Sequence, residues 1–161
     1  MKKEAFLKAV EVYQSMVYRM ALHYFGNSYD AEDATQEVFL RLYRQEKAFE
    51  NEEHLRHWLM RVTVNHCKDV LKSPWRKRRV DYDALAVEPV FDRVEQRELY
   101  REVMALPEKY RTVLNLYYYE ELSTKEIAEI LDLQQTAVTT RLSRARNLLK
   151  NRLGEVWKDE E

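Results

Sequence analysis

Residues 121–153 read ELSTKEIAEILDLQQTAVTTRLSRARNLLKNRL and predict two helices separated by a short turn. Ser123 can cap the first helix, because Glu126 follows three residues later, where a capping box has its acid. Apolar residues recur at helical spacing on both sides of a break at residues 132–134, and a second helix should begin near Gln135. This arrangement is typical of a helix-turn-helix.

The outer face of the second helix is basic and carries small polar side chains. Residues 134–153 contain five Lys or Arg and no acid. The small polar residues of this face are Thr136, Thr139, Thr140, Ser143 and Asn147. Arg and Lys neutralise phosphates, and short side chains let a helix reach base edges, so the pattern indicates DNA binding. The alternative is a solvated basic helix at the end of a bundle, because charged helix faces are common.

Composition favours helices and argues against tight DNA binding by the chain alone. Its 161 residues suffice for one domain or two small ones, and two Gly and three Pro are too few for a sheet protein with many turns. The net charge is −1, yet residues 56–80 hold eight Lys or Arg against one Asp. Two basic segments among acidic ones predict modest, salt-sensitive affinity, so another protein should bring this chain to DNA.

The sequence predicts a soluble, cytoplasmic protein without direct membrane insertion. No apolar run approaches the length of a membrane span, and no signal peptide opens the chain. The single cysteine, Cys67, excludes an internal disulfide.

Periodicity predicts five more helices and an all-α fold of two small domains. The helices are expected at about residues 3–25, 30–45 (with Ser28 as an earlier start), 53–71, 92–105 and 107–120. The predicted domains are residues 1–73 and 92–161, joined by a flexible acidic linker at residues 74–91, with the helix-turn-helix in the second domain. The predicted buried faces include Tyr43, Trp58, His66 and Leu99, and Pro107 is placed in the first turn of its helix.

A metal site is the only candidate for enzymatic chemistry. His54 and His57 stand three residues apart, but His66 and Cys67 lie nine or more residues further on, and no other ligand has matching spacing. No Gly-rich phosphate loop and no pairing of nucleophile and base is present. We expect no metal, no cofactor and no enzymatic activity; a small metal-dependent enzyme using these four residues is the alternative.

Four stretches together resemble a bacterial RNA polymerase sigma factor of the extracytoplasmic-function type (group four). They are DAEDATQEVFLRLYR (30–44), LRHWLMRVTVNHCKDVLK (55–72), ALPEKYRTVLNLYYYEELSTKEIAEIL (105–131) and TRLSRARNLLK (140–150). The resemblance covers nearly the whole chain and implies a protein that directs core RNA polymerase to promoters and assists DNA melting. It also implies that the first domain binds the polymerase clamp and the −10 element, that the second binds the polymerase flap and the −35 element, and that an anti-sigma factor regulates the protein.

The resemblance assigns roles to residues of the first domain. The expected polymerase contacts are Asp33, Gln36, Glu37 and Arg41. The loop at residues 47–53 is expected to capture a base flipped from the −10 strand, with Phe49 stacking on it, Asn51 beside it and Asn65 hydrogen-bonding it. The residues expected to hold the melting strand are Arg61, Lys68, Trp75 and Arg76, the last two in the basic run WRKRR (75–79).

In the second domain the resemblance assigns the −35 contacts. These are Thr136, Thr139, Thr140, Arg141, Ser143 and Arg144 of the second helix, with Lys125 of the first helix at the DNA backbone. The chain departs from the family at two positions. Asp132 stands where many members have Gly, and Gln134 stands where many have a capping Ser.

A stand-alone helix-turn-helix regulator is the other interpretation. Such a protein would bind operators without polymerase and would need a dimerisation surface. It would leave the stretches at residues 30–44 and 55–72 without a role.

Overall fold

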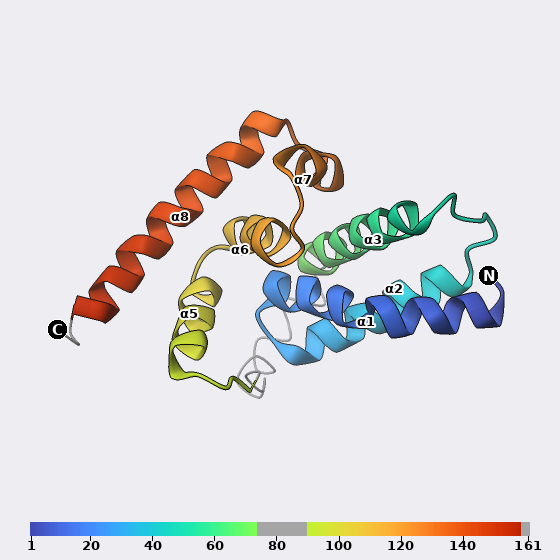
Figure 1. Cartoon of the computed structure of the whole chain (residues 1–161), viewed down its shortest axis with the longest axis horizontal. Helices are drawn as coiled ribbons and strands as arrows, with labels where there is room; N and C mark the ends of the chain where they lie inside the picture. The colour runs from blue at the N-terminus through green and yellow to red at the C-terminus, as the bar shows by residue number, and fades with distance from the viewer. Residues whose placement is uncertain (74–89, 159–161) are drawn as a thin grey trace. The chain divides into compact units, whose positions relative to one another are not determined.

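The computed structural model describes residues 1–73 and 90–158 (Figure 1). The chain divides into two compact units, Met1–Val87 and Glu88–Glu161. All the regular structure in the described ranges is helical, which confirms the all-α prediction with a helix-turn-helix in the second unit. The expected linker falls, except for its last two residues, outside the described residues. Among the described residues, no helix is both long enough and apolar enough to cross a membrane.

Within residues 1–73, three helices form the first unit. They are α1 (Lys3–Phe25), α2 (Ser28–Tyr43) and α3 (Glu52–Lys72). Gly26 ends α1 with a φ of 81°, a left-handed conformation that glycine adopts without strain. Asn27 then caps α2, and its side chain accepts a hydrogen bond from the backbone N–H of Asp30 at 2.9 Å. Local capping therefore fixes the tight corner between α1 and α2.

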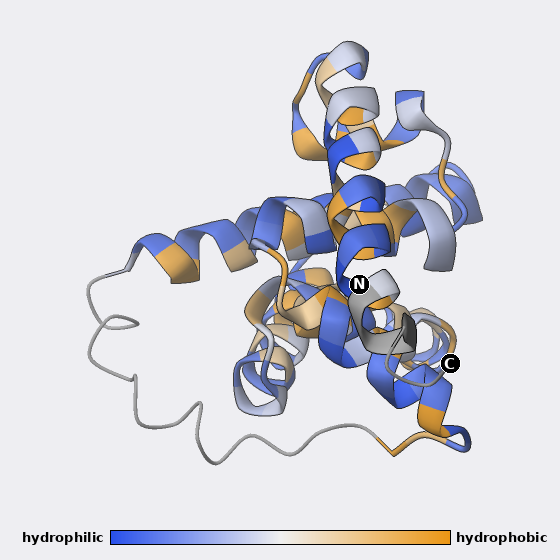
Figure 2. Cartoon of the chain, turned by 90° about the vertical axis from the view of Figure 1, so that its left-hand side faces the viewer, coloured by the Kyte–Doolittle hydropathy of each residue, from blue (hydrophilic) through white to orange (hydrophobic). Residues whose placement is uncertain are grey.

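The three helices pack against one another around an apolar core. The most deeply buried apolar side chains of this core are Val17, Val38, Leu42, Leu59 and Met60. Each such side chain contributes about 1.5–3 kcal/mol by leaving water. Figure 2 shows hydrophobic and hydrophilic residues alternating along the helices, as expected of amphipathic helices that bury one side.

Two parts of the first unit differ from the predicted burial. Tyr43 is 52% exposed rather than buried: it is the last residue of α2, and its ring makes an edge contact with Phe6. Trp58 and His66 are half-buried, since α3 is rotated about its axis relative to the predicted orientation. Leu55 and Leu59 are buried, as their helical spacing predicts, and the helix also turns Met60, Thr63, Val64 and Cys67 toward the core.

Within residues 90–158, the second unit consists of helices around α8. They are α5 (Val94–Met104), α6 (Glu108–Leu114), the π-helix η2 (Asn115–Tyr119), α7 (Thr124–Leu131) and α8 (Gln135–Lys158). α5, α6 and α7 each pack against α8. The most deeply buried apolar side chains here are Val113, Leu116, Ile127, Val138 and Leu142.

The start of the second unit also departs from the prediction. Leu99 is 42% exposed, and α5 buries no residue completely. Val103 is the α5 residue that packs on the cluster of Leu106, Tyr110, Leu114 and Ala145. Pro107 precedes α6 rather than occupying its first turn. A short helix held by few contacts cannot bury all the apolar positions that its periodicity suggests.

The helix predicted to end near Glu120 changes its form after Leu114. The backbone N–H of Glu120 donates to Asn115 O at 3.1 Å, which is the five-residue spacing of a π-helix. This turn inserts an extra residue, and it presents Tyr118 and Tyr119 at the surface. Glu121 follows with a φ of 56°, in the left-handed region.

Candidate nucleic-acid interface

The helix-turn-helix begins with the predicted capping box. The backbone N–H of Glu126 donates to Ser123 Oγ at 3.1 Å, and the backbone N–H of Ser123 donates to Glu126 Oε1 at 3.1 Å. Two backbone donors that the first turn of α7 leaves unpaired are thereby satisfied. The start of α7 is thus fixed by two residues three positions apart.

The turn between α7 and α8 depends on Asp132. Its φ of 55° and ψ of 51° lie in the left-handed region. The turn after α7 therefore keeps the conformation that glycine adopts most easily, although a residue with a side chain stands there. The backbone N–H of Leu133 donates to Ala128 O at 2.9 Å, which closes the turn. The side chain of Gln135 then donates from Nε2 to Thr124 Oγ1 at 2.8 Å, so the first residue of α8 is tied to the first residue of α7.

The predicted DNA-facing residues of α8 share its outer surface. Val138, Leu142 and Ala145 are buried against the rest of the second unit. The exposed residues of the opposite face are Thr136, Thr139, Thr140, Ser143 and Arg144, and Lys125 of α7 is exposed as well. Arg141 is half-buried at the edge of this face. The structure therefore exposes the candidate −35 contacts of α8 on one side of the helix, with Arg141 at its edge.

Two of the threonine hydroxyls on this surface, those of Thr139 and Thr140, already donate their protons within the helix. Thr140 Oγ1 donates to Thr136 O at 2.9 Å, and Thr139 Oγ1 lies 3.0 Å from both Gln135 O and Thr136 O. The hydroxyl protons therefore point toward the helix, and methyl groups and oxygen lone pairs remain for a ligand. Such groups suit the amino groups of adenine and cytosine or the methyl group of thymine.

Two of the five basic residues of α8 are held within the second unit. Arg146 Nε donates to the Tyr118 hydroxyl at 2.7 Å, and its guanidinium lies 5.3 Å and 5.6 Å from the ring centroids of Tyr117 and Tyr118. Arg152 Nε forms an ion pair with Glu102 at 2.6 Å. Both side chains stay exposed but are held by these contacts, and Glu102 offsets the charge of Arg152.

In the first unit, Phe49 belongs to an aromatic cluster on the loop before α3. Its ring makes edge contacts with His54 at 5.2 Å and with Trp58 at 5.5 Å between centroids. Asn51 caps α3, with its side chain accepting from the backbone N–H of His54 at 2.8 Å. The sequence prediction missed His54 and Trp58 as neighbours of Phe49. Their spacing of four residues, which places both on one helix face, was the available signal.

A cleft of about 900 Å³ opens beside this cluster. It lies between the first half of α1, the loop and the start of α3, and its lining includes Phe49, Asn51 and Lys47. Tyr13 of α1 donates to Glu52 Oε2 at 2.7 Å across the cleft. Burial and this bond raise the pKa of Tyr13 to about 12, so the phenol remains protonated and keeps α1 tied to α3.

A polar face of α3 continues from the aromatic cluster. At 100° per residue, Trp58, Arg61, Asn65 and Lys68 fall within an arc of about 80°, roughly opposite the buried face. Arg61 and Asn65 are exposed, and Lys68 is half-exposed. Trp75 and Arg76, the remaining candidates for the −10 region, lie outside the described residues.

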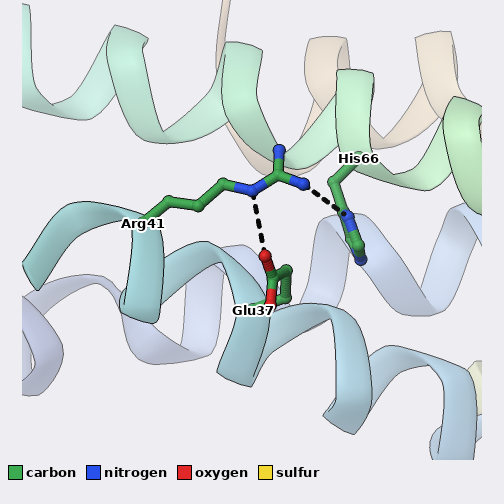
Figure 3. A network of polar contacts seen from close by, with 3 residues as sticks. All are labelled: Glu37, Arg41 and His66. Atoms are coloured by element: carbon green, nitrogen blue, oxygen red, sulfur yellow. Dashed lines mark hydrogen bonds and ion pairs between the residues drawn. The ribbon is translucent and has the colours of Figure 1, made fainter. Parts of the chain in front are cut away.

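The predicted polymerase-binding residues occupy one exposed side of α2. Asp33 and Gln36 are exposed, while Glu37 and Arg41 are half-exposed and paired with each other, Arg41 Nε to Glu37 Oε1 at 3.2 Å (Figure 3). Arg41 also reaches α3, with its Nη2 3.3 Å from His66 Nδ1.

The same side of α2 carries apolar side chains that the sequence prediction did not assign to it. Tyr29 is 46% exposed and Leu40 is 47% exposed, and both lie with Tyr43 within an arc of about 80° that also contains Asp33. Exposed apolar residues among charged ones are typical of a protein-binding surface.

The four residues of the metal-enzyme interpretation have other surroundings. Among the described residues they form no group of three ligand atoms within 4.8 Å. His54 Nδ1 accepts from the backbone N–H of Glu50 at 3.1 Å, and His66 Nδ1 faces Arg41. Cys67 is buried, which raises the pKa of its thiol.

Comparison with known proteins assigns each of the two units to a family. The family model for Sigma-70 region 2 matches residues 9–77, and that for Sigma-70 region 4 matches residues 96–149. The chain is 30% identical to the ECF RNA polymerase sigma factor SigW of Bacillus subtilis (strain 168), over 96% of this chain and 91% of that protein. It is 31% identical to the ECF RNA polymerase sigma-E factor of Haemophilus influenzae, over 94% and 88% of the two chains.

A solved structure shares the fold. The sigma factor RpoE from Bartonella quintana, crystallised with the anti-sigma factor NepR, superposes with a TM-score of 0.74 at 21% identity, over 94% of this chain and 98% of that one. A relative matched over nearly the whole of both chains, two matched family models and the same helical fold lead to one conclusion. The chain belongs to the extracytoplasmic-function (ECF) family of RNA polymerase sigma factors, and it directs core RNA polymerase to promoters.

Proposed function

We propose that the first unit binds the polymerase clamp through α2 and the −10 element through α3 and the loop before it. The second unit binds the polymerase flap and reads the −35 element through α8. The observation that carries this proposal is the exposed side of α8, where hydroxyl and guanidinium groups lie together while Val138, Leu142 and Ala145 are buried. The protein acts by binding rather than by catalysis, in the cytoplasm, where the polymerase and the DNA are.

At the −10 element, Phe49 stacks on a base that has left the DNA duplex. The edge contacts with His54 and Trp58 hold the ring in one orientation, which reduces the entropy lost when the base binds. The cleft beside it offers room for a flipped base, and Asn65 supplies a hydrogen-bonding amide on the adjoining face of α3. Arg61 and Lys68 contact the phosphates of the same strand.

At the polymerase, the charged residues of α2 set the orientation of docking. Asp33, Gln36, Glu37 and Arg41 supply the polar contacts. Leu40 and Tyr29 supply the apolar centre that a stable protein interface requires. Because this surface holds charges of both signs around apolar side chains, it suits a partner with the complementary pattern.

At the −35 element, α8 enters the major groove. Thr136, Thr139, Thr140 and Ser143 approach base edges. Arg144 contacts a base or the backbone, and Arg141 and Lys125 contact phosphates. Because the net charge of the whole chain is only −1, these contacts suffice for promoter binding only together with the polymerase.

An anti-sigma factor regulates this protein. The support is the RpoE structure with NepR and the structure of CnrH with the cytosolic domain of CnrY, to which the chain superposes with TM-scores of 0.74 and 0.66. Purification of the protein from its native cell under mild conditions should recover such a partner in stoichiometric amount. Recovery with polymerase subunits alone, under every growth condition, would contradict this part of the proposal.

The experiment that tests the proposal uses core RNA polymerase and a library of genomic DNA fragments. Transcripts made with the protein should start downstream of two short shared sequences at a fixed spacing, and reactions without the protein should lack these starts. A stand-alone regulator would leave the starts of core polymerase unchanged. Starts that require the protein but share no upstream sequence would contradict the assignment of promoter reading to α3 and α8.

A further inference from the structure

Arg41 lies at the centre of a contact that joins two helices of the first unit. Its Nε is 3.2 Å from Glu37 Oε1 on α2, and its Nη2 is 3.3 Å from His66 Nδ1 on α3 (Figure 3). The Arg41 and Glu37 side chains are 40% and 37% exposed, so the guanidinium remains within reach of a partner. An exposed ion pair four residues apart on one helix contributes little and moves with that helix. The contact with His66 is different, because it fixes the end of the arginine against a second helix.

The chemistry of the two side chains determines the state of the histidine ring. Arginine has only N–H donors, so His66 Nδ1 must accept the hydrogen bond, and the proton of the neutral ring is on Nε2. Burial lowers the pKa of His66, and the nearby Arg41 cation lowers it further, while Glu37 and Asp69 oppose this shift. The ring is therefore neutral at physiological pH and can hold the guanidinium.

We propose that His66 is a positioning residue, which holds Arg41 in the orientation that the polymerase binds. The proposal rests on the function proposed above for the exposed side of α2. A free arginine loses side-chain entropy when it docks, and a guanidinium already held by Glu37 and His66 loses less. Because His66 directly follows Asn65, the contact also links the polymerase-binding side of α2 to the helix that faces the −10 strand.

Protonation of His66 removes this hold. A proton on Nδ1 would point an N–H at the arginine donor, and two cations would face each other at 3.3 Å. The charged groups that act on the ring are Arg41 and Glu37 from α2 and Asp69 from α3 itself. Since the ring is neutral above its lowered pKa, polymerase affinity should be unchanged at neutral and alkaline pH. It should fall as the pH drops through that pKa.

The test measures the affinity of the full chain for core RNA polymerase between about pH 5 and about pH 8. His66→Leu removes the acceptor and should weaken binding roughly three- to tenfold at neutral pH. His66→Asn places a neutral carbonyl oxygen near the position of Nδ1. It should retain most of the affinity and lose the additional weakening at low pH that the unchanged protein shows. His57→Asn is the matched control on α3 and should keep the pH profile of the unchanged protein.

Arg41→Ala separates this inference from the function on which it rests. If Arg41→Ala leaves polymerase binding intact, the assignment of α2 fails. If Arg41→Ala weakens binding and His66→Leu does not, only the positioning role fails. The double variant with Arg41→Ala and His66→Leu should bind the polymerase no more weakly than Arg41→Ala alone. Additive losses of polymerase affinity would overturn the proposal. Should His66→Leu fold poorly by circular dichroism, the pH profile of His66→Asn decides, and a profile identical to that of the unchanged protein overturns the proposal.

Discussion

Arg144 and Arg146 stand two residues apart on α8, yet their side chains have different surroundings. Arg144 is exposed on the same face as Thr140 and Ser143. Arg146 turns toward η2, where the Tyr118 hydroxyl and two aromatic rings hold it. At the scale of single residues, the structure therefore separates an exposed guanidinium on the proposed DNA-binding face from one that side chains of η2 hold. A helical wheel drawn from the sequence could not make this distinction, because it contains no information about η2.

Salt dependence distinguishes the two arginines. Arg144→Ala should weaken promoter binding by the polymerase complex, by about 1–3 kcal/mol if the residue reads a base. If it contacts a phosphate, the slope of log affinity against log salt should fall by about one. Arg146→Ala should leave the slope unchanged and lower the melting temperature of the protein. Equal changes in slope for both variants would contradict the separate roles.

Phe49 offers a second test at this scale. Phe49→Ala removes the stacking surface, so promoter opening by the polymerase complex should fall at least several-fold, since base stacking contributes about 1–3 kcal/mol. Binding of the variant to core polymerase should not change. Phe91→Ala, which removes an aromatic ring paired with Tyr100 in the second unit, is the matched control and should leave opening intact. Loss of polymerase binding by Phe49→Ala would contradict the base-binding role.

At the scale of the elements, local signals in the sequence predicted the helix boundaries well. The capping box at Ser123 and the break at Asp132 fixed both ends of α7, because both depend on residues close in sequence. The buried side of α3 could not be predicted in the same way. That helix has apolar residues on most of its circumference, so contacts with α1 and α2 decide which of them face inward. The π-helix η2 was not predicted either, since no residue pattern specifies the five-residue hydrogen bond of Glu120.

The turn between α7 and α8 should be more stable with glycine. Asp132 has a φ of 55°, which costs a residue with a side chain roughly 1 kcal/mol. Asp132→Gly should therefore raise the free energy of unfolding of the second unit by up to about 1 kcal/mol, reduced by the greater entropy of glycine in the unfolded chain. Asp132→Ala, which keeps the Cβ, is the control and should be less stable than Asp132→Gly in a thermal melt. Equal stability of the two variants would show that the turn is not strained.

At the scale of the whole molecule, the proposed function depends on surfaces carried by two units. The first unit presents α2 and the face of α3 that includes Asn65, and the second presents the outer face of α8. The sequence predicted the residues of these surfaces mainly through family resemblance. Charge alone indicated only weak DNA binding. It could not show that Tyr29 and Leu40 lie exposed beside Asp33, because apolar residues are normally assigned to the core.

The most direct test of the central claim compares promoter binding with and without core RNA polymerase. A labelled fragment carrying the two shared sequences found by transcription should be bound weakly and in a salt-sensitive manner by the protein alone. It should be bound tightly, with opening of the −10 region, by the protein together with core polymerase. Tight, sequence-specific binding by the protein alone, unaffected by core polymerase, would contradict the account.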